Sequence, residues 1–257
     1  MNINFIETNN MNEEEYTRYK RQLILPEIGE KGQEKLKFSK VLVIGAGGLG
    51  SPVIYYLAAA GIGTIGIVDS DEVDVSNLQR QIIHRNRDLG KLKVDSAYEK
   101  ALSLNPNINV ITYPFKLEKN NIADIISEYD FVIDCVDNFK TKFLINDECV
   151  RLKKPFCYGG VAGFEGHIMT YVPDKGPCLR CVFDGVDEKQ EDEDGPIGVI
   201  GALPGIIGSY QALEAMKYLI GIGENLVGRF LIFNGLTFTH KILPVEKASW
   251  CKICGER

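Results

Sequence analysis

Hydrophobic and polar positions follow two different patterns along the chain. From residue 40 to residue 161, short and almost wholly apolar runs alternate with longer stretches of helical character. Apolar strands that are each followed by a helix are typical of a parallel sheet covered on both faces. The predicted strands are 41–45, 64–71, 108–115, 130–136 and 155–161, and the predicted helices are 49–61, 91–104, 119–128 and 139–152.

After residue 161 the pattern changes. Segments 166–173 and 228–244 favour antiparallel strands, and the second segment is hairpin-like around Asn234-Gly235. Between them, segment 203–221 predicts a helix with a single apolar stripe. The stripe consists of Ile206, Tyr210, Leu213, Met216 and Ile220, at spacings of three and four. The acidic segment 184–198 has no periodicity and predicts a mobile loop.

Two short helices, 12–25 and 30–37, are expected before the first strand, on either side of Pro26. The whole pattern predicts an α/β fold of Rossmann-like type, in which a parallel sheet in the N-terminal two-thirds continues into antiparallel strands. A length of 257 residues is sufficient for one large α/β domain with a sizeable core.

Composition excludes several classes of partner. No apolar run approaches the roughly 18 residues of a membrane-spanning helix. The N-terminus lacks the basic and apolar regions of an export signal, so a cytoplasmic location is expected. The net charge is −6 and the longest charge cluster, 187–194, is acidic, which argues against a nucleic-acid partner.

Three glycines form a G-x-G-x-x-G motif between the first strand and its helix, namely Gly45, Gly47 and Gly50. The first allows a tight turn, the second lets a phosphate approach the backbone, and the third packs helix against strand. Asp69 closes the second strand, where a carboxylate accepts hydrogen bonds from ribose hydroxyls. These features alone favour a nicotinamide-dependent dehydrogenase; a glycine turn without a ligand is the alternative.

The segment that follows Asp69 is basic in a chain that is acidic elsewhere. It carries Asn77, Arg80, Arg85, Arg87, Lys91 and Lys93. Reaction at the α-phosphorus of a triphosphate releases pyrophosphate, whose developing charge requires arginine and lysine partners. The cluster therefore favours ATP over a dinucleotide. The alternative is a solvated surface, to which Arg85 and Arg87 could belong.

Two aspartates, Asp134 and Asp137, end the fourth predicted strand. Ligands bind at the carboxyl ends of strands in open α/β sheets, so Asp137 is expected in the same crevice as the glycine motif. A carboxylate opposite a triphosphate requires Mg²⁺ between them, or else it orients the attacking group. The alternative is that Asp137 or Asn138 only caps helix 139–152.

Four of the seven cysteines form two C-x-x-C pairs, Cys178 with Cys181 and Cys251 with Cys254. Two such knuckles supply the four thiolates of a closed, structural zinc site. A redox couple is the alternative. The other three cysteines stand alone in apolar settings and are expected to be buried; they are Cys135, Cys149 and Cys157.

Together these motifs resemble the ThiF/MoeB/HesA family, bacterial relatives of ubiquitin-activating enzymes, over residues 12–256. The resemblance rests on RYKRQ (18–22), GAGGLGS (45–51), VDSDEVDVSNLQRQ (68–81), GKLKV (90–94), DCVDN (134–138), GSYQALEAMK (208–217) and both C-x-x-C pairs. It implies an adenylyltransferase that uses Mg-ATP to adenylate the C-terminal glycine of a ubiquitin-like sulfur carrier (ThiS- or MoaD-like, ending in Gly-Gly), releasing pyrophosphate. Thiamine or molybdopterin biosynthesis would be served. The alternatives are adenylation of another carboxylate such as a peptide, a NAD-binding oxidoreductase, or a non-catalytic scaffold.

The resemblance also implies roles for matching residues. The ATP phosphates would be held by Gly45, Gly47, Gly48 and Gly50, and the ribose by Asp69. The triphosphate would be surrounded by Asp71, Asn77, Arg80 and Lys93, with Asp137 and Asn138 opposite and Mg²⁺ at Asp137. Arg21 would reach the ATP of the partner subunit in a homodimer, and the catalytic residues would be Arg21, Arg80, Lys93 and Asp137. Residues 1–257 would form one adenylation domain, with a helical arm (12–38), a nucleotide-binding half (40–160) and a carrier-binding half that holds zinc (161–257).

One departure from the family pattern concerns a loop cysteine that many relatives carry. Asp194 stands at the matching position, and no cysteine lies between Cys181 and Cys251. A carboxylate cannot form a thioester or an acyl disulfide. We therefore expect an enzyme that stops at the acyl-adenylate. No rhodanese-like segment follows Arg257, so a separate sulfurtransferase or cysteine desulfurase is expected to deliver sulfur.

Overall fold

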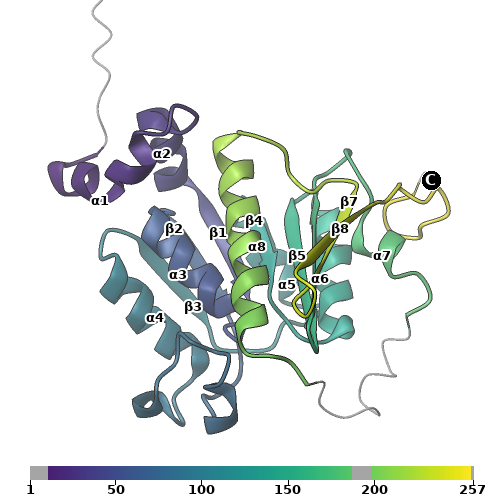
Figure 1. Cartoon of the computed structure of the whole chain (residues 1–257), viewed down its shortest axis with the longest axis horizontal. Coiled ribbons are helices and arrows are strands. Elements are labelled where there is room, and N and C mark those ends of the chain that lie inside the picture. Colours follow the sequence, from purple (N-terminus) through teal and green to yellow (C-terminus); the bar gives the residue numbers. More distant parts are fainter. Residues whose placement is uncertain (1–10, 187–197, 256–257) are drawn as a thin grey trace, which may run out of the picture.

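A computed structural model describes residues 11–186 and 198–255. One eight-stranded sheet runs through it in the order β3-β2-β1-β4-β5-β6-β7-β8, with helices on both faces (Figure 1). The strands are β1 (Lys40–Ile44), β2 (Thr64–Val68), β3 (Asn109–Tyr113), β4 (Phe131–Asp134), β5 (Phe156–Ala162), β6 (Glu165–Tyr171), β7 (Arg229–Asn234) and β8 (Thr239–Pro244). Pairings from β3 to β5 are parallel and those from β5 to β8 are antiparallel, which confirms the predicted fold class.

The helices follow the predicted alternation. They are α1 (Glu13–Leu23), α2 (Gly29–Phe38), α3 (Gly50–Ala60), α4 (Lys93–Leu104), α5 (Ile122–Ser127), α6 (Phe139–Arg151), α7 (Leu179–Val182) and α8 (Ala202–Ile220), with short 3₁₀ turns at η1 (Val75–Asn77) and η2 (Asn86–Asp88). None of the helices in the described residues is both long and apolar enough to cross a membrane. The predicted loop 184–198 falls mostly outside the described residues.

Two apolar layers explain why the strands are hydrophobic throughout. Val41 and Val43 of β1 face a core layer that includes α3, α4 and α8, whereas Leu42 and Ile44 face a second layer that includes α5 and α6. Because alternate side chains of a strand point to opposite faces, a strand covered on both faces has no polar positions.

Most of the predicted apolar stripe of α8 packs against the core, since Ile220 is buried and Ile206, Tyr210 and Met216 are partly buried against it. Leu213 is 49% exposed, whereas Ile207, Gln211 and Ala215 are fully buried. A Cβ at Gly208 would lie 2.4 Å from the carbonyl oxygen of Leu49, so α8 lies close to the start of α3. Close approach of two helices requires small residues, so the most buried positions of α8 lie around Gly208, and Leu213 is the stripe residue that faces outward.

The topology brings the ends of β1 and β4 together. The two strands are parallel neighbours, although 86 residues separate the end of β1 at Ile44 from the start of β4 at Phe131. Strand order reverses between them, and this switch point is where open α/β sheets bind ligands. The carboxyl ends of the parallel strands lie at the bottom of Figure 1, where α3 and α8 begin.

Candidate functional site

The turn between β1 and α3 is constrained at two of its glycines. Gly45 has a φ of +99°, and a Cβ there would lie 2.8 Å from the carbonyl oxygen of Cys135. A Cβ at Gly50 would lie 1.9 Å from the carbonyl oxygen of Gly45. At Gly47 the nearest atom would be Gln81 Nε2 at 3.5 Å, an ordinary contact. The chain's own packing therefore does not require glycine at residue 47, whereas close approach of a phosphate would.

Asp69, directly after β2, is hydrogen-bonded to the glycine turn. Its Oδ2 accepts a hydrogen bond from the Ala46 N–H at 2.8 Å, and its Oδ1 accepts one from the Asp71 N–H at 2.9 Å. Burial raises the pKa of the Asp69 carboxyl, and the nearby Lys93 ammonium acts in the opposite direction. Each carboxylate oxygen has a second lone pair, so the group can still accept from ribose hydroxyls.

The predicted triphosphate residues gather beside this turn. Lys93 is 7% exposed, and its Nζ lies 2.8 Å from Oδ2 of Asp71. The Arg80 side chain lies against the glycine turn, since a Cβ at Gly48 would be 3.5 Å from Arg80 Cγ. Its Nη1 donates a hydrogen bond to the Ser76 carbonyl. The Asn77 side chain accepts from the Asp74 N–H at 3.1 Å, which closes η1.

Asp137 and Asn138 follow β4 next to the glycine turn. Asn138 Oδ1 accepts from the Thr141 N–H at 2.9 Å, so the capping alternative holds for Asn138. Asp137 is exposed and receives a long hydrogen bond of 3.5 Å from the Asn138 amide. Its carboxylate is therefore available at the strand end, and a carboxylate is a suitable ligand for Mg²⁺.

A buried ion pair supports the segment that carries Asp137. Lys142 Nζ lies 3.3 Å from both carboxylate oxygens of Asp134 and donates to the Gly159 carbonyl at 2.7 Å. Asp134 Oδ1 also accepts from the Val136 N–H at 3.1 Å. Burial raises the pKa of the Asp134 carboxyl, and the Lys142 ammonium opposes this shift. The pair holds the end of β4 to α6 and β5.

Replacing Lys142 by methionine would leave the Asp134 carboxylate buried without a counter-charge. We expect Lys142→Met to lower the free energy of unfolding by about 3–5 kcal/mol, measured by urea denaturation. Lys140→Met, an exposed lysine on the same helix, is the matched control and should change stability little. Adding Asp134→Asn to Lys142→Met should recover part of the loss, and a Lys142→Met variant as stable as its control would contradict the assignment.

Arg21 is not brought to the glycine turn of its own chain. It is exposed on α1 and lines a surface cavity with Tyr56 and Ala60, which lie towards the C-terminal end of α3. The glycine turn is at the other end of this 11-residue helix, about 16 Å away along its axis. Arg18, three residues earlier, pairs with Glu14 at 3.0 Å and is a surface charge.

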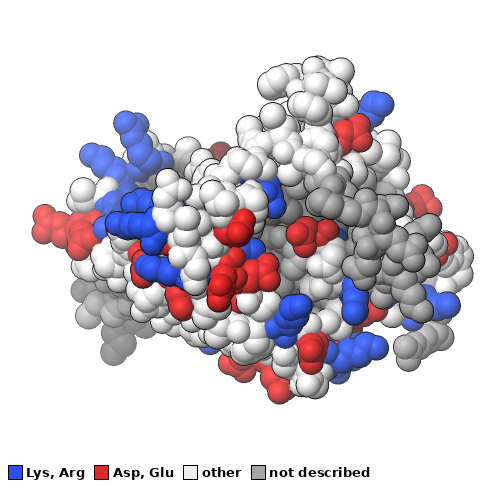
Figure 2. Space-filling model, turned by 90° about the horizontal axis from the view of Figure 1, so that it is seen from below, with Lys and Arg blue, Asp and Glu red and all other residues white. Residues whose placement is uncertain are grey.

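Sequence reasoning missed four buried polar residues beneath the turn, namely Gln81, His84, Ser96 and Lys100. Gln81 Oε1 is buried and has no hydrogen-bond partner among the described residues. The sequence did contain a signal for Ser96 and Lys100. Their spacing places them on the same face of the helix as the apolar residues Val94, Ala97 and Ala101, which indicates burial. Arg85 and Arg87 are exposed, in agreement with the solvated alternative. Figure 2 shows the carboxyl-end face, on which acidic and basic side chains are intermixed.

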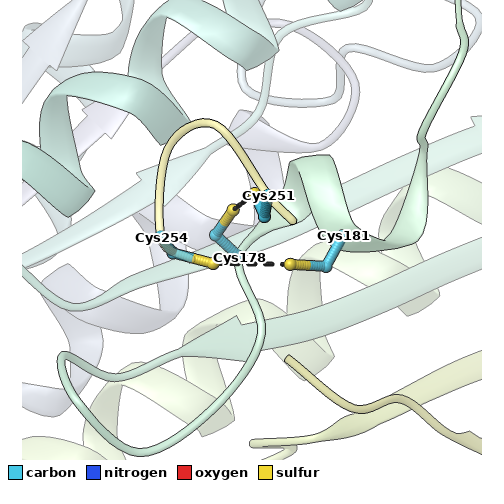
Figure 3. A group of neighbouring side chains, drawn as sticks. All are labelled: Cys178, Cys181, Cys251 and Cys254. Atoms are coloured by element: carbon cyan, nitrogen blue, oxygen red, sulfur yellow. Dashed lines mark hydrogen bonds between the residues drawn. The ribbon is translucent and has the colours of Figure 1, made fainter. Parts of the chain in front are cut away.

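The four paired cysteines converge as predicted. Their Sγ atoms all lie within 4.8 Å of one another, with Cys178–Cys251 at 3.7 Å and Cys181–Cys254 at 3.4 Å (Figure 3). Tetrahedral zinc with Zn–S bonds of about 2.3 Å separates its sulfurs by about 3.8 Å, so the cluster fits this ion. One pair lies at α7 and the other in the C-terminal segment, and the cluster joins the two.

The three lone cysteines are buried, as predicted. Cys149 and Cys157 are inaccessible to solvent, and Cys135 is 6% exposed. Burial raises the pKa of all three thiols well above its ordinary value. Since a thiolate is the nucleophilic form, none of them is suited to replace a loop cysteine. Asp194 lies outside the described residues.

A family profile and two full-length relatives match nearly the whole chain. Residues 19–253 match the sequence profile of the ThiF family. The chain is 41% identical to a sulfur carrier protein adenylyltransferase of Thermus thermophilus, over 95% of this chain and 92% of that protein. It is 42% identical to the SAMP-activating enzyme E1 of Haloferax volcanii, over 93% and 88%.

Other matches are partial or distant. The chain is 44% identical to the maize adenylyltransferase and sulfurtransferase MOCS3-1 over 93% of its residues, and spans 52% of the length of that protein. A crystal structure of Escherichia coli MccB superposes with a TM-score of 0.85 over 96% of this chain and 76% of MccB. At 23% identity that likeness shows the shared fold.

Proposed function

The chain belongs to the ThiF family, whose members use ATP, and we propose that it adenylates the C-terminal glycine of a small ubiquitin-like sulfur-carrier protein. The carrier is of ThiS- or MoaD-like type, ends in Gly-Gly and serves thiamine or molybdopterin biosynthesis. The observation that carries this proposal is geometric. The glycine turn and Asp137 follow the neighbouring strands β1 and β4, and Lys93, at the start of α4, lies near Asp69. The chain that carries them matches a sulfur carrier protein adenylyltransferase along 92% of that relative.

ATP occupies the switch point between β1 and β4. The glycine turn and the start of α3 hold its phosphates, since free N–H groups at a helix N-terminus bind anions. Asp69, fixed to the turn by the Ala46 N–H, accepts from the ribose hydroxyls. An NAD-dependent reaction would give Asp137 and the basic residues no role.

The chemistry is substitution at the α-phosphorus. An oxygen of the carrier's terminal carboxylate attacks, the bond between the α-phosphorus and the bridging oxygen breaks, and pyrophosphate leaves with that electron pair. Arg80 and Lys93 stabilise the charge on the leaving phosphates. Asp137 would hold Mg²⁺, which would supply Lewis-acid stabilisation of the phosphate charge. Positioning and electrostatics therefore account for the catalysis.

The active unit is a homodimer in which Arg21 of one subunit completes the ATP site of the other. Arg21 is exposed and far from the glycine turn of its own chain, which supports assigning it to the site of a second chain. The carrier binds mainly to the half of the chain after residue 160. A separate sulfurtransferase or cysteine desulfurase then replaces AMP with sulfur.

The adenylated product tests the proposal directly. Enzyme, Mg-ATP and a ThiS- or MoaD-like carrier should yield a carrier with AMP on its terminal glycine, seen by intact mass spectrometry. A carrier without its last glycine and a free peptide of the same C-terminal sequence are the controls. Equal modification of the free peptide would point to a peptide-activating enzyme, and binding of the carrier without any product would point to a scaffold.

Zinc in the four-cysteine cluster has a structural role. The four cysteines join the C-terminal segment to α7. Arg180 of α7 in turn donates two hydrogen bonds, of 2.7 and 2.8 Å, to the carboxylate of Asp147 on α6. We expect Cys251→Ser to lower zinc content below one ion per chain and the melting temperature by roughly 8–16 °C, as for a loss of about 4 kcal/mol. Cys149→Ser, at a buried cysteine outside the cluster, should retain the zinc. Full metal content in Cys251→Ser would contradict the assignment.

The reaction stops at the acyl-adenylate. The described cysteines outside the cluster are buried, and position 194 is an aspartate. We therefore expect no dithiothreitol-sensitive adduct between enzyme and carrier by mass spectrometry after incubation with ATP. An adduct that disappears on reduction would contradict this expectation, and peptide mapping would identify the cysteine that forms it.

A further inference from the structure

A buried chain of polar side chains joins α4 to the glycine turn. His84 Nε2 lies 2.9 Å from the carbonyl oxygen of Ala46, and its Nδ1 lies 2.8 Å from Ser96 Oγ. Lys100 Nζ donates to Ser96 Oγ at 3.0 Å and also pairs with Asp88. All four side chains are at least 95% buried. None of these residues has a role in the proposed chemistry.

The two ends of this polar network fix the direction of the hydrogen bonds that they make. The Lys100 ammonium can only donate, so Ser96 Oγ accepts from it and can donate its own hydrogen to His84 Nδ1. The carbonyl oxygen of Ala46 can only accept, so His84 Nε2 carries the ring proton. The neutral imidazole with its proton on Nε2 therefore satisfies all of the contacts. A protonated ring would instead donate from Nδ1 to Ser96 Oγ, which would leave the Ser96 hydrogen without this acceptor and place a second cation beside Lys100.

The charges around the ring also favour this form. Burial lowers the pKa of His84, and Lys93 and Lys100 lower it further. The Ala46 carbonyl and the Asp88 carboxylate act in the opposite direction. The ring is thus neutral near pH 7, with an Nε2–H group that can donate to Ala46.

The Ala46 carbonyl matters because it shares a peptide plane with the Gly47 N–H. The two groups of a trans peptide point in opposite directions, so a donor that holds the carbonyl also orients the N–H. Asp69 holds the N–H of Ala46, the preceding peptide unit. The turn is therefore tied on both sides of Ala46, by Asp69 and by His84.

We propose that His84 is a positioning residue for the nucleotide, which orients the Gly47 N–H towards a phosphate by donating a hydrogen bond to the Ala46 carbonyl. The inference rests on ATP binding at the glycine turn, as in the proposed function. It links two sequence segments, QRQIIH (79–84) and KVDSAYEK (93–100), to the conformation of a turn that neither segment contains.

Paired substitutions at His84 separate positioning from packing. His84→Gln keeps an N–H donor near the place of Nε2, whereas His84→Leu keeps the bulk and removes the donor. ATP affinity is measured by calorimetry without carrier, and thermal unfolding verifies that each variant is folded. We expect His84→Leu to weaken ATP binding about fivefold to tenfold, as for the loss of one hydrogen bond, with KM for the carrier unchanged. His84→Gln should restore affinity to within about twofold of wild type.

A measurement on the unaltered protein covers the case in which His84→Leu does not fold. The chain has only three histidines, so a [¹⁵N]histidine spectrum contains signals from three imidazole rings. The signals that are missing from the spectrum of His84→Gln belong to His84. We expect an unprotonated Nδ1 and a proton on Nε2 that shifts when ATP is added. A proton on Nδ1, or equal ATP affinity in wild type and His84→Leu, would overturn the inference alone. A wild-type protein that binds NAD and not ATP would overturn the proposed function as well.

Discussion

Asp137→Ala is expected to lower ATP–pyrophosphate exchange by about 10²–10³-fold, the loss found when one group that stabilises transition-state charge is removed. The carboxylate is exposed at the end of β4, and Asn138 supplies the cap of α6, so folding does not depend on Asp137. Arg80→Ala should reduce exchange to a similar extent, because the pyrophosphate charge loses a partner. Thermal unfolding of both variants should match wild type within a few degrees.

Asp124→Ala is the matched control, since Asp124 is an exposed aspartate in the first turn of α5 and away from the strand end. Exchange in this variant should equal that of wild type. Exchange at the wild-type rate in Asp137→Ala or Arg80→Ala would remove that residue from the catalytic set.

Arg21→Ala is expected to lower exchange by about 10²-fold or more, although Arg21 lies at the far end of α3 from the glycine turn of its own chain. A mixed dimer then distinguishes a contribution in trans from one in cis. One subunit carries Arg21→Ala and the other carries Asp137→Ala, each with its own affinity tag. If Arg21 acts in trans, one of the two sites has both an intact Asp137 and an intact Arg21 from its partner.

A randomly assorted mixture of the two inactive variants should thus recover about a quarter of the wild-type exchange, because half of the dimers are mixed and each has one working site. Arg18→Ala, in which a surface arginine that pairs with Glu14 is removed, should leave exchange unchanged. If mixing restores no activity while size-exclusion chromatography shows mixed dimers, Arg21 does not act in trans.

Features of the fold that depend on local composition were predictable from the sequence. Runs such as Val41 to Ile44 are apolar at every position because both faces of their strands are covered, and this makes a parallel sheet recognisable. The two C-x-x-C pairs were also predictable as one cluster, since their chemistry requires four sulfurs.

Features that depend on close tertiary contact were not predictable. The buried face of α8 is set by Gly208, which lets the helix lie against Leu49, and helical periodicity favoured a stripe that includes the exposed Leu213. His84 and Ser96 are 12 residues apart and meet only because the segment between them folds back under the turn. Arg21 has no catalytic contact that a single chain can reveal, because its proposed site belongs to another subunit.

The most direct test of the central claim is ATP–pyrophosphate exchange with purified ThiS- and MoaD-like carriers. The account predicts exchange that requires Mg²⁺ and one of these carriers with its terminal Gly-Gly intact, and that is lost when the last glycine is removed. Exchange that is absent with every carrier, or that is indifferent to the carrier's C-terminus, would contradict it.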